Sequence, residues 1–165
     1  MATSKSRLLK ELKAVQQHNA QRRDDTSQEQ STSYIIELCP NETNLMEWHA
    51  VLEGPENTPY AQGRFRVALV VPQTYPMSPP DARFVTPIFH PNVHFKTGEI
   101  CLDILKNEWS PAWTLMSVCQ AIVALMSDPA ADSPLNCDAG NLIRAGDMRA
   151  YNGLARMYTI EHAKM

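Results

Sequence analysis

The 165-residue sequence contains no apolar run approaching the roughly 18 residues that a helix needs to cross a bilayer. Its first residues, MATSKS, lack the apolar segment of a secretory signal, and the final AKM matches no targeting address. We therefore expect a cytosolic protein.

Cysteine is scarce, with four residues at positions 39, 101, 119 and 137, and no CxxC pair occurs. This excludes a disulfide framework and the paired spacings of structural zinc sites. Cys119 lies in an apolar helical run and is predicted to be buried, whereas Cys39 and Cys137 have no site assembled around them in the sequence. Cys101 differs because it ends a long polar loop.

The chain lacks net positive charge outside its N-terminal segment. Residues 1–23 contain six Lys and Arg side chains against Glu11 alone, so the net charge of −3 leaves −8 for the rest of the chain. Such an acidic remainder repels phosphate, so no nucleic-acid partner is expected. The basic segment fits either an acidic partner protein or a solvated helix face.

Four runs have the composition of strands and precede most of the helical segments: 34–38, 45–53, 64–71 and 82–86. In the third run Phe65, Val67 and Leu69 alternate with polar or small residues, which is typical of a strand with one buried face. The connectors CPNETN and GPENTPYAQG are short turn-formers, which favours an antiparallel meander.

Apolar residues at helical spacing predict helices before and after these strands. Leu8, Leu12 and Val15 predict a helix over about 4–22, and Leu115, Val118 and Ile122 predict a buried helix over about 114–128. A short helix at 138–144 and a last one from about 146 to the end complete the order. The stripe expected on the last helix is Met148, Tyr151, Leu154, Ala155 and Tyr158. Helices grouped around consecutive strands indicate an α+β fold, with residues 1–165 as one domain.

An irregular stretch from Pro87 to Pro111 separates strands and helices, and loops of this length are often functional. From residue types alone, Cys101 is a structural cysteine, a zinc ligand with His90 and His94, or a nucleophile. No second Cys/His cluster completes a zinc site, so no metal or other cofactor is predicted. His90-Pro91-Asn92 has the composition of a turn, which favours His90 as a hydrogen-bonded structural residue over a base.

The segments YPMSPPDARFVTPIFHPN, TGEICLDIL, EWSPAWTL and SDPAADSPL, spanning residues 75–135, resemble the core of a ubiquitin-conjugating enzyme (E2). The resemblance covers nearly the whole chain. It implies the ubiquitin-conjugating (UBC) fold, with an N-terminal helix, a four-stranded meander, an active-site loop and C-terminal helices. It also implies that Cys101 accepts ubiquitin from an E1 activating enzyme as a thioester and passes it on with a RING-type E3 ligase.

The resemblance implies roles for other residues. Asn92 takes the place of the family's oxyanion or loop-supporting asparagine, and Asp103 orients the nucleophile or is an exposed loop carboxylate. Ser133 stands where many relatives have an acid, so it is a candidate gate for the acceptor. The loop before Cys101 is one residue longer than is common, with the insertion around 94–97.

A ligase surface is implied as well. Its residues are Arg7, Met77, Ser78, Pro111 and Ala112. Gln120 stands near the apolar face that holds the donor ubiquitin in several relatives.

The C-terminal run DSPLNCDAGNLIRAGDMRAYNGLARMYT resembles the peroxisomal branch of the family. This implies monoubiquitination of a peroxisomal import receptor for recycling, and Ser133 would suit a cysteine acceptor. It also implies a membrane anchor protein that holds the enzyme on the cytosolic face of the peroxisome. The alternatives are a general cytosolic E2 for lysine ubiquitination, a non-catalytic ubiquitin-binding scaffold of the same fold, and a thiol hydrolase.

Overall fold

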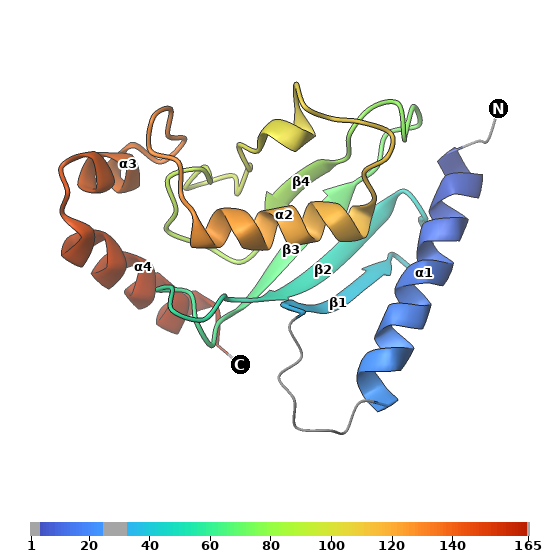
Figure 1. The fold of residues 1–165 in the computed structure, drawn as a ribbon, viewed down its shortest axis with the longest axis horizontal. Coiled ribbons are helices and arrows are strands. Elements are labelled where there is room, and N and C mark those ends of the chain that lie inside the picture. Colours follow the sequence, from blue (N-terminus) through green and yellow to red (C-terminus); the bar gives the residue numbers. More distant parts are fainter. Residues whose placement is uncertain (1–3, 25–32, 165) are drawn as a thin grey trace.

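The computed structural model describes residues 4–24 and 33–164. The polar segment DDTSQEQSTS at 24–33, for which the sequence predicts a loop, lies almost entirely outside the described residues. The elements in chain order are α1 (Ser4–Asp24), β1 (Ile35–Pro40), β2 (Glu47–Glu53), β3 (Arg64–Val70), β4 (Asp81–Phe84), a 3-10 turn η1 (Asp103–Leu105), α2 (Leu115–Ser127), α3 (Cys137–Arg144) and α4 (Met148–His162). The strands form one antiparallel sheet in the order β1-β2-β3-β4 (Figure 1). The predicted α+β meander is confirmed.

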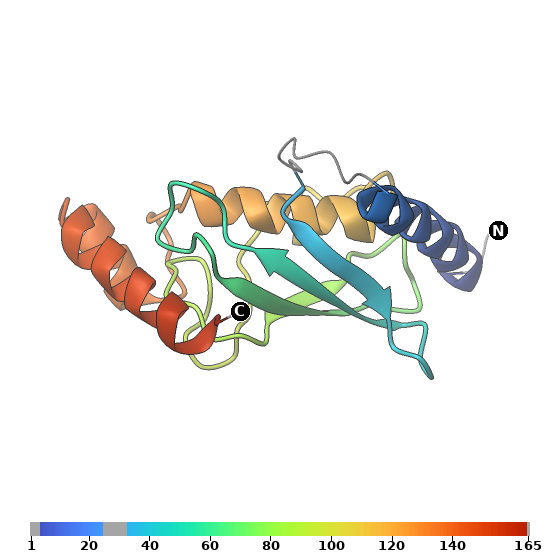
Figure 2. The same cartoon turned by 90° about the horizontal axis from the view of Figure 1, so that it is seen from below.

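One face of the sheet is buried and the other is exposed. Alternate residues of β2 and β3 point into the core: Trp48, Ala50, Leu52, Phe65, Val67 and Leu69. Helix α2 runs along this face and contributes its own apolar side, as Figure 2 shows. The alternation in β3 and the burial of Cys119 were both predicted, and both are confirmed.

A β-bulge in β1 sets which side chains of this edge strand face outward. The pairing with β2 shifts between Ile35 and Glu37, which inserts one residue into β1. Strict alternation from the buried Ile35 would turn Glu37 into the core and Leu38 outward. The bulge reverses this, so Leu38 is buried while Glu37 is exposed and Cys39 is half-buried on the open face.

Glu11 is the buried hydrogen-bonding centre that joins α1 to the rest of the molecule. Its Oε1 accepts from Arg7 Nε at 2.7 Å and from the Tyr75 hydroxyl at 2.6 Å, and its Oε2 accepts from the Leu115 backbone N–H at 2.8 Å. Leu115 N–H belongs to the N-terminus of α2, where a carboxylate is electrostatically favoured. Glu11, the one acidic residue in the basic N-terminal segment, therefore links α1 to the N-terminus of α2 and to the loop that contains Tyr75.

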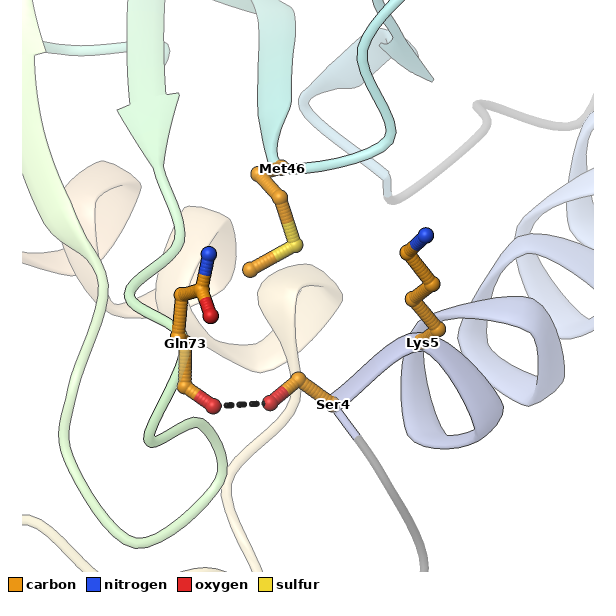
Figure 3. A pocket seen from close by; sticks show the side chains of 4 residues that line it. All are labelled: Ser4, Lys5, Met46 and Gln73. Atoms are coloured by element: carbon orange, nitrogen blue, oxygen red, sulfur yellow. Dashed lines mark hydrogen bonds between the residues drawn. The ribbon is translucent and has the colours of Figure 1, made fainter.

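The first turn of α1 makes a separate contact with the segment between β3 and β4. Figure 3 shows Ser4 donating a hydrogen bond from its Oγ to the Gln73 carbonyl oxygen beside the Met46 side chain. Ser4, Lys5, Met46 and Gln73 line a cavity of about 360 Å³ at this junction. The two contacts together fix the start of α1.

We expect Glu11→Gln to lower the free energy of unfolding by about 1–3 kcal/mol, because a neutral amide satisfies only part of the three donors that meet the carboxylate. The measurement is urea unfolding followed by circular dichroism. Glu42→Gln, at an exposed position, is the matched control and should change stability little. Equal stability of the two variants would contradict the role of Glu11.

Helix α4 packs through part of the predicted stripe, because Tyr158 is half-buried against the core and two other members are fully buried. Tyr151, Ala155 and Thr159 are buried, whereas Met148 and Leu154 are exposed. The Tyr151 hydroxyl lies 2.7 Å from that of Tyr60, whose O–H donates to the Phe89 carbonyl at 2.8 Å. This buried polar contact fixes the rotation of α4, and apolar spacing alone could not reveal it. Within the part of the chain that the structure describes, no helix has the length and apolar character needed to cross a membrane.

Candidate active site

Cys101 lies directly after a short antiparallel bridge between Val93 and Ile100. Its backbone N–H donates to the Asn92 carbonyl at 2.8 Å, so Asn92 and Cys101 are held side by side. The Cys101 side chain is half-buried. The irregular stretch predicted from the sequence therefore contains a small hairpin that presents one accessible thiol.

The longer loop forms the tip of this hairpin. His94 Nδ1 accepts from the backbone N–H groups of Lys96 at 3.3 Å and Thr97 at 3.2 Å. Gly98 has φ of +71°, and a Cβ there would lie 2.0 Å from the Phe84 carbonyl oxygen. Phe95 contacts Tyr158 of α4 with ring centroids 5.9 Å apart. The longer loop is therefore taken up at the tip, in residues 94–97, and the backbone hydrogen bond between Asn92 and Cys101 is kept.

His90 is buried, and both of its ring nitrogens are engaged. Nδ1 accepts from the Asn92 backbone N–H at 3.0 Å, which places the ring proton on Nε2, where it can donate to the Leu125 carbonyl at 2.9 Å. Burial lowers the pKa of His90 to about 4. The ring is therefore neutral at physiological pH, and it tethers the loop to α2.

This burial makes stability depend on pH. The unfolded chain binds a proton on His90 below its ordinary pKa of 6.5, whereas the folded chain binds it only near 4. Stability is therefore intact above pH 6.5 and falls as pH drops towards 4, by about 3 kcal/mol from this group. Urea unfolding across that range should show a smaller fall in His90→Gln than in the unaltered chain. Parallel curves would contradict this.

Asn92 fastens a second loop beside the thiol. Its buried amide makes two bonds to Ala130: Nδ2 donates to the carbonyl at 2.7 Å, and Oδ1 accepts from the N–H at 2.8 Å. The Pro91 carbonyl accepts from the backbone N–H groups of Leu135 at 2.8 Å and Asn136 at 3.1 Å. The HPN turn therefore positions the whole segment between α2 and α3.

Ser133 and Asp103 both have exposed side chains near these loops. Ser133 lies within the segment fastened by Asn92, and Asp103 begins η1, where its carbonyl accepts from the Lys106 and Glu108 N–H groups at 2.9 and 3.0 Å. Both side chains are accessible to an incoming molecule.

Sequence reasoning missed Lys106, whose Nζ lies 3.8 Å from Cys101 Sγ. The approach depends on the η1 turn, which folds the chain back within five residues. A cation here attracts negative charge on the sulfur, although solvent screens the contact. No spacing rule for irregular loops would have indicated this pair.

The residues expected on a ligase surface come from three segments that contact one another. Arg7 donates from Nη2 to the Trp113 carbonyl at 2.9 Å, and Trp109 Nε1 donates to the Pro76 carbonyl at 2.8 Å. These bonds link α1, the 75–80 turn and the 109–113 turn. Met77 is 74 % exposed, Pro111 and Ala112 are exposed, and Ser78 is half-buried.

Arg7 is the least available member of this set. Its guanidinium is held by Glu11 as well as by Trp113, and the hydrogen bond to Glu11 raises the pKa of Arg7. Arg7 therefore holds the segments of this surface together through internal hydrogen bonds. Met77 is the most exposed apolar side chain of the expected ligase surface.

Side chains that could together hold a metal ion lie away from the histidines near Cys101, for which the sequence predicts no metal site. Among the described residues, His90, His94 and Cys101 form no cluster of possible ligands, whereas Glu37, Cys39 and His49 do. The expectation that Cys39 has no site around it is wrong, because its Sγ lies 2.9 Å from His49 Nε2 across the β1–β2 pair. The bulge in β1 produces this juxtaposition, which could not be read from spacing.

Known proteins match this geometry over most of the chain. A family model described as ubiquitin-conjugating enzyme matches residues 7–159. Protein PEROXIN-4 of Arabidopsis thaliana is 55 % identical over 96 % of this chain and 94 % of its own length. Ubiquitin-conjugating enzyme E2 pex4 of Dictyostelium discoideum is 53 % identical over 93 % of this chain and 95 % of its own.

Solved structures agree. Pex4p of H. polymorpha, crystallised in complex with the soluble domain of Pex22p, has a TM-score of 0.89 and 35 % identity, covering 98 % of this chain and 99 % of that one. The E2 domain of a Toxoplasma gondii ubiquitin conjugating enzyme has a TM-score of 0.82 and 33 % identity, covering 97 % and 99 %. The chain therefore belongs to the ubiquitin-conjugating enzyme family and is an E2 of the Pex4 type.

Proposed function

We propose that Cys101 carries ubiquitin as a thioester and delivers a single ubiquitin to a peroxisomal import receptor for its recycling. The observation that carries the proposal is the accessible Cys101 thiol beside the buried Asn92. The backbone N–H of Cys101 donates a hydrogen bond to the Asn92 carbonyl. The Arabidopsis and Dictyostelium relatives, more than half identical and bearing peroxin-4 and pex4 in their names, support the peroxisomal part.

The chemistry needs no permanent base. Cys101 Sγ attacks the thioester carbonyl of E1-bound ubiquitin, a C–S bond to Cys101 forms, and the E1 thiol leaves with the proton that Cys101 gives up. An acceptor amine or thiol then attacks the same carbonyl, and Cys101 leaves as a thiolate, which takes up the proton that the acceptor gives up. Because a thioester is already an activated acyl group, positioning and oxyanion stabilisation matter more than acidification of the attacking thiol.

The groups around Cys101 fit these steps. The Asn92 amide has a second N–H available beyond its bond to Ala130, which supports oxyanion or loop-supporting action. The Lys106 ammonium, 3.8 Å from the sulfur, favours departure of the Cys101 thiolate. We assign the exposed Asp103 carboxylate to orienting the acceptor, and His90 to holding the loop through its contact with the Leu125 carbonyl. A RING-type ligase would contact the surface that includes Met77.

Ser133 is the proposed gate that admits a receptor cysteine. A hydroxyl cannot stabilise a lysine ammonium by charge or take its proton as a carboxylate can, and a thiol acceptor needs neither. We therefore expect Ser133→Asp to raise discharge to free lysine several-fold and leave discharge to free cysteine unchanged. Single-turnover assays on preformed thioester measure both rates.

Gln16→Glu on α1 adds the same charge at another exposed position and serves as the matched control. If Ser133→Asp changed lysine discharge and cysteine discharge equally, the proposal that Ser133 selects a cysteine acceptor would be wrong.

The cellular role is tested separately. We propose that a membrane anchor holds this chain, taken as one UBC domain, on the cytosolic face of the peroxisome. The H. polymorpha Pex4p structure with the soluble domain of Pex22p supports such a partner. Deletion of the gene should abolish receptor monoubiquitination and impair peroxisomal import. Normal receptor modification after deletion would contradict the peroxisomal assignment.

A further inference from the structure

The open face of the sheet bears a group of three possible metal ligands on the edge strand β1 and its neighbour β2. Cys39 is the direct cross-strand partner of His49, and the bulge turns Glu37 to the same face. Cys39 Sγ lies 2.9 Å from His49 Nε2 and 3.4 Å from Glu37 Oε1, and the last two atoms are 3.9 Å apart. The three ligand atoms therefore form a compact triangle.

The size of this triangle suits a tetrahedral zinc ion. With Zn–S of about 2.3 Å and Zn–N and Zn–O of about 2.0–2.2 Å, tetrahedral ligands lie about 3.4–3.6 Å from one another. The observed separation of 3.4 Å lies at the lower end of that range, while 2.9 and 3.9 Å lie below and above it, so rotations of surface side chains suffice to reach it. Thiolate, imidazole and carboxylate are also the donors that zinc prefers.

We propose that Glu37, Cys39 and His49 bind one Zn²⁺, with water as the fourth ligand. Two anionic ligands neutralise the ion, and His49 binds through Nε2 as a neutral ring. The Cys39 thiol gives up its proton to solvent as the Zn–S bond forms. In the metal-free protein this thiol donates to Glu37, and desolvation, with this bond adding to it, raises the pKa of Cys39 to about 11.

The surroundings leave the site accessible. His49 and Glu37 are exposed, and the β3 residue opposite His49 is Ala68, with only a methyl side chain. The cations on the β3 side are Arg66, paired with Val51, and Arg83, paired with Ala68. Zinc here would join β1 to β2 and stabilise the edge strand that follows the segment 25–32.

The site is distinct from the proposed thioester site. Cys101 follows β4, and β1 and β4 are the two opposite edges of the sheet (Figure 1). Binding of zinc by Glu37, Cys39 and His49 therefore does not require the Cys101 thiol, and Cys101→Ser leaves this site intact. The inference holds whether or not the proposed receptor chemistry is correct.

The test uses the full chain bearing Cys101→Ser, titrated with Co²⁺ as a spectroscopic probe and with Zn²⁺ in competition. We expect one Co²⁺ per chain with a thiolate-to-cobalt charge-transfer band that Zn²⁺ removes. Adding Cys39→Ser should abolish the band, while Cys137→Ser, at another exposed cysteine, should leave it unchanged. A band that survives Cys39→Ser, or no band at all, would overturn the proposal.

Thermal unfolding gives an independent readout of the same site. Free zinc at about 100 times its dissociation constant should raise Tm by about 5–10 °C. His49→Gln and Glu37→Gln should each remove most of this shift, with circular dichroism in the absence of metal showing that the variants fold. A zinc-induced rise in Tm that is as large in both variants as in the parent chain would refute the site. No rise in Tm in the parent chain would refute it as well.

Discussion

Cys101→Ala should form no ubiquitin adduct with E1 and ATP, whereas Cys101→Ser should form one that resists thiols. The alanine variant lacks a nucleophile, and the serine variant forms an oxygen ester, which thiols cleave far more slowly than a thioester. The unaltered chain should form an adduct that a reducing agent removes. A non-reducing gel, run with and without reducing agent, separates the three outcomes.

Cys137→Ser is the matched control because Cys137 is a free cysteine that is even more exposed than the half-buried Cys101. It should load ubiquitin at the rate of the unaltered chain. A thiol-sensitive adduct that persists in Cys101→Ala would show that another cysteine accepts ubiquitin. The scaffold alternative would be favoured if the unaltered chain formed no adduct at all.

Asn92→Ala should slow discharge of the thioester by about 10²–10³-fold, the loss typical of removing an oxyanion donor. The substitution also breaks both hydrogen bonds to Ala130, which releases the segment bearing Ser133. Loading from excess E1 should still reach completion, so the discharge step can be measured alone on purified thioester.

Two further variants sharpen the assignment of Asn92. Asn92→Asp keeps an acceptor for the Ala130 N–H but loses the amide donor, so it should discharge nearly as slowly as Asn92→Ala. Asn107→Ala removes an exposed amide in the turn after η1 and should have little effect. Discharge by Asn92→Ala within about twofold of the unaltered rate would contradict any direct role.

Local patterning was enough to predict most of the fold. The alternation of Phe65, Val67 and Leu69 and the spacing of Leu115, Val118 and Ile122 each report one buried face, and each places its element correctly. The last helix was located, and its predicted stripe is confirmed at Tyr151 and Ala155 but wrong at Met148 and Leu154, which are exposed. The buried Tyr60–Tyr151 contact helps to set which side of this helix faces the core, and it joins residues 91 positions apart.

The site was only partly accessible from the sequence. The HPN and GEIC motifs indicated Cys101 and Asn92, but the burial of Glu11, the approach of Lys106 to Cys101 and the Cys39–His49 pair were missed. Each depends on a tertiary contact, a 3-10 turn or a β-bulge. Such features change which side chains meet without leaving a periodic signal in the sequence.

The most direct test of the central claim is to map the ubiquitin attachment site on the unaltered chain. The chain is loaded with ubiquitin, E1 and ATP, kept at mildly acidic pH to preserve the thioester, and analysed by intact and fragment mass spectrometry. The account predicts one ubiquitin, joined through its C-terminal glycine to the Cys101 sulfur and released by thiol. Attachment at Cys39, Cys119 or Cys137, or no thioester at any cysteine, would contradict it.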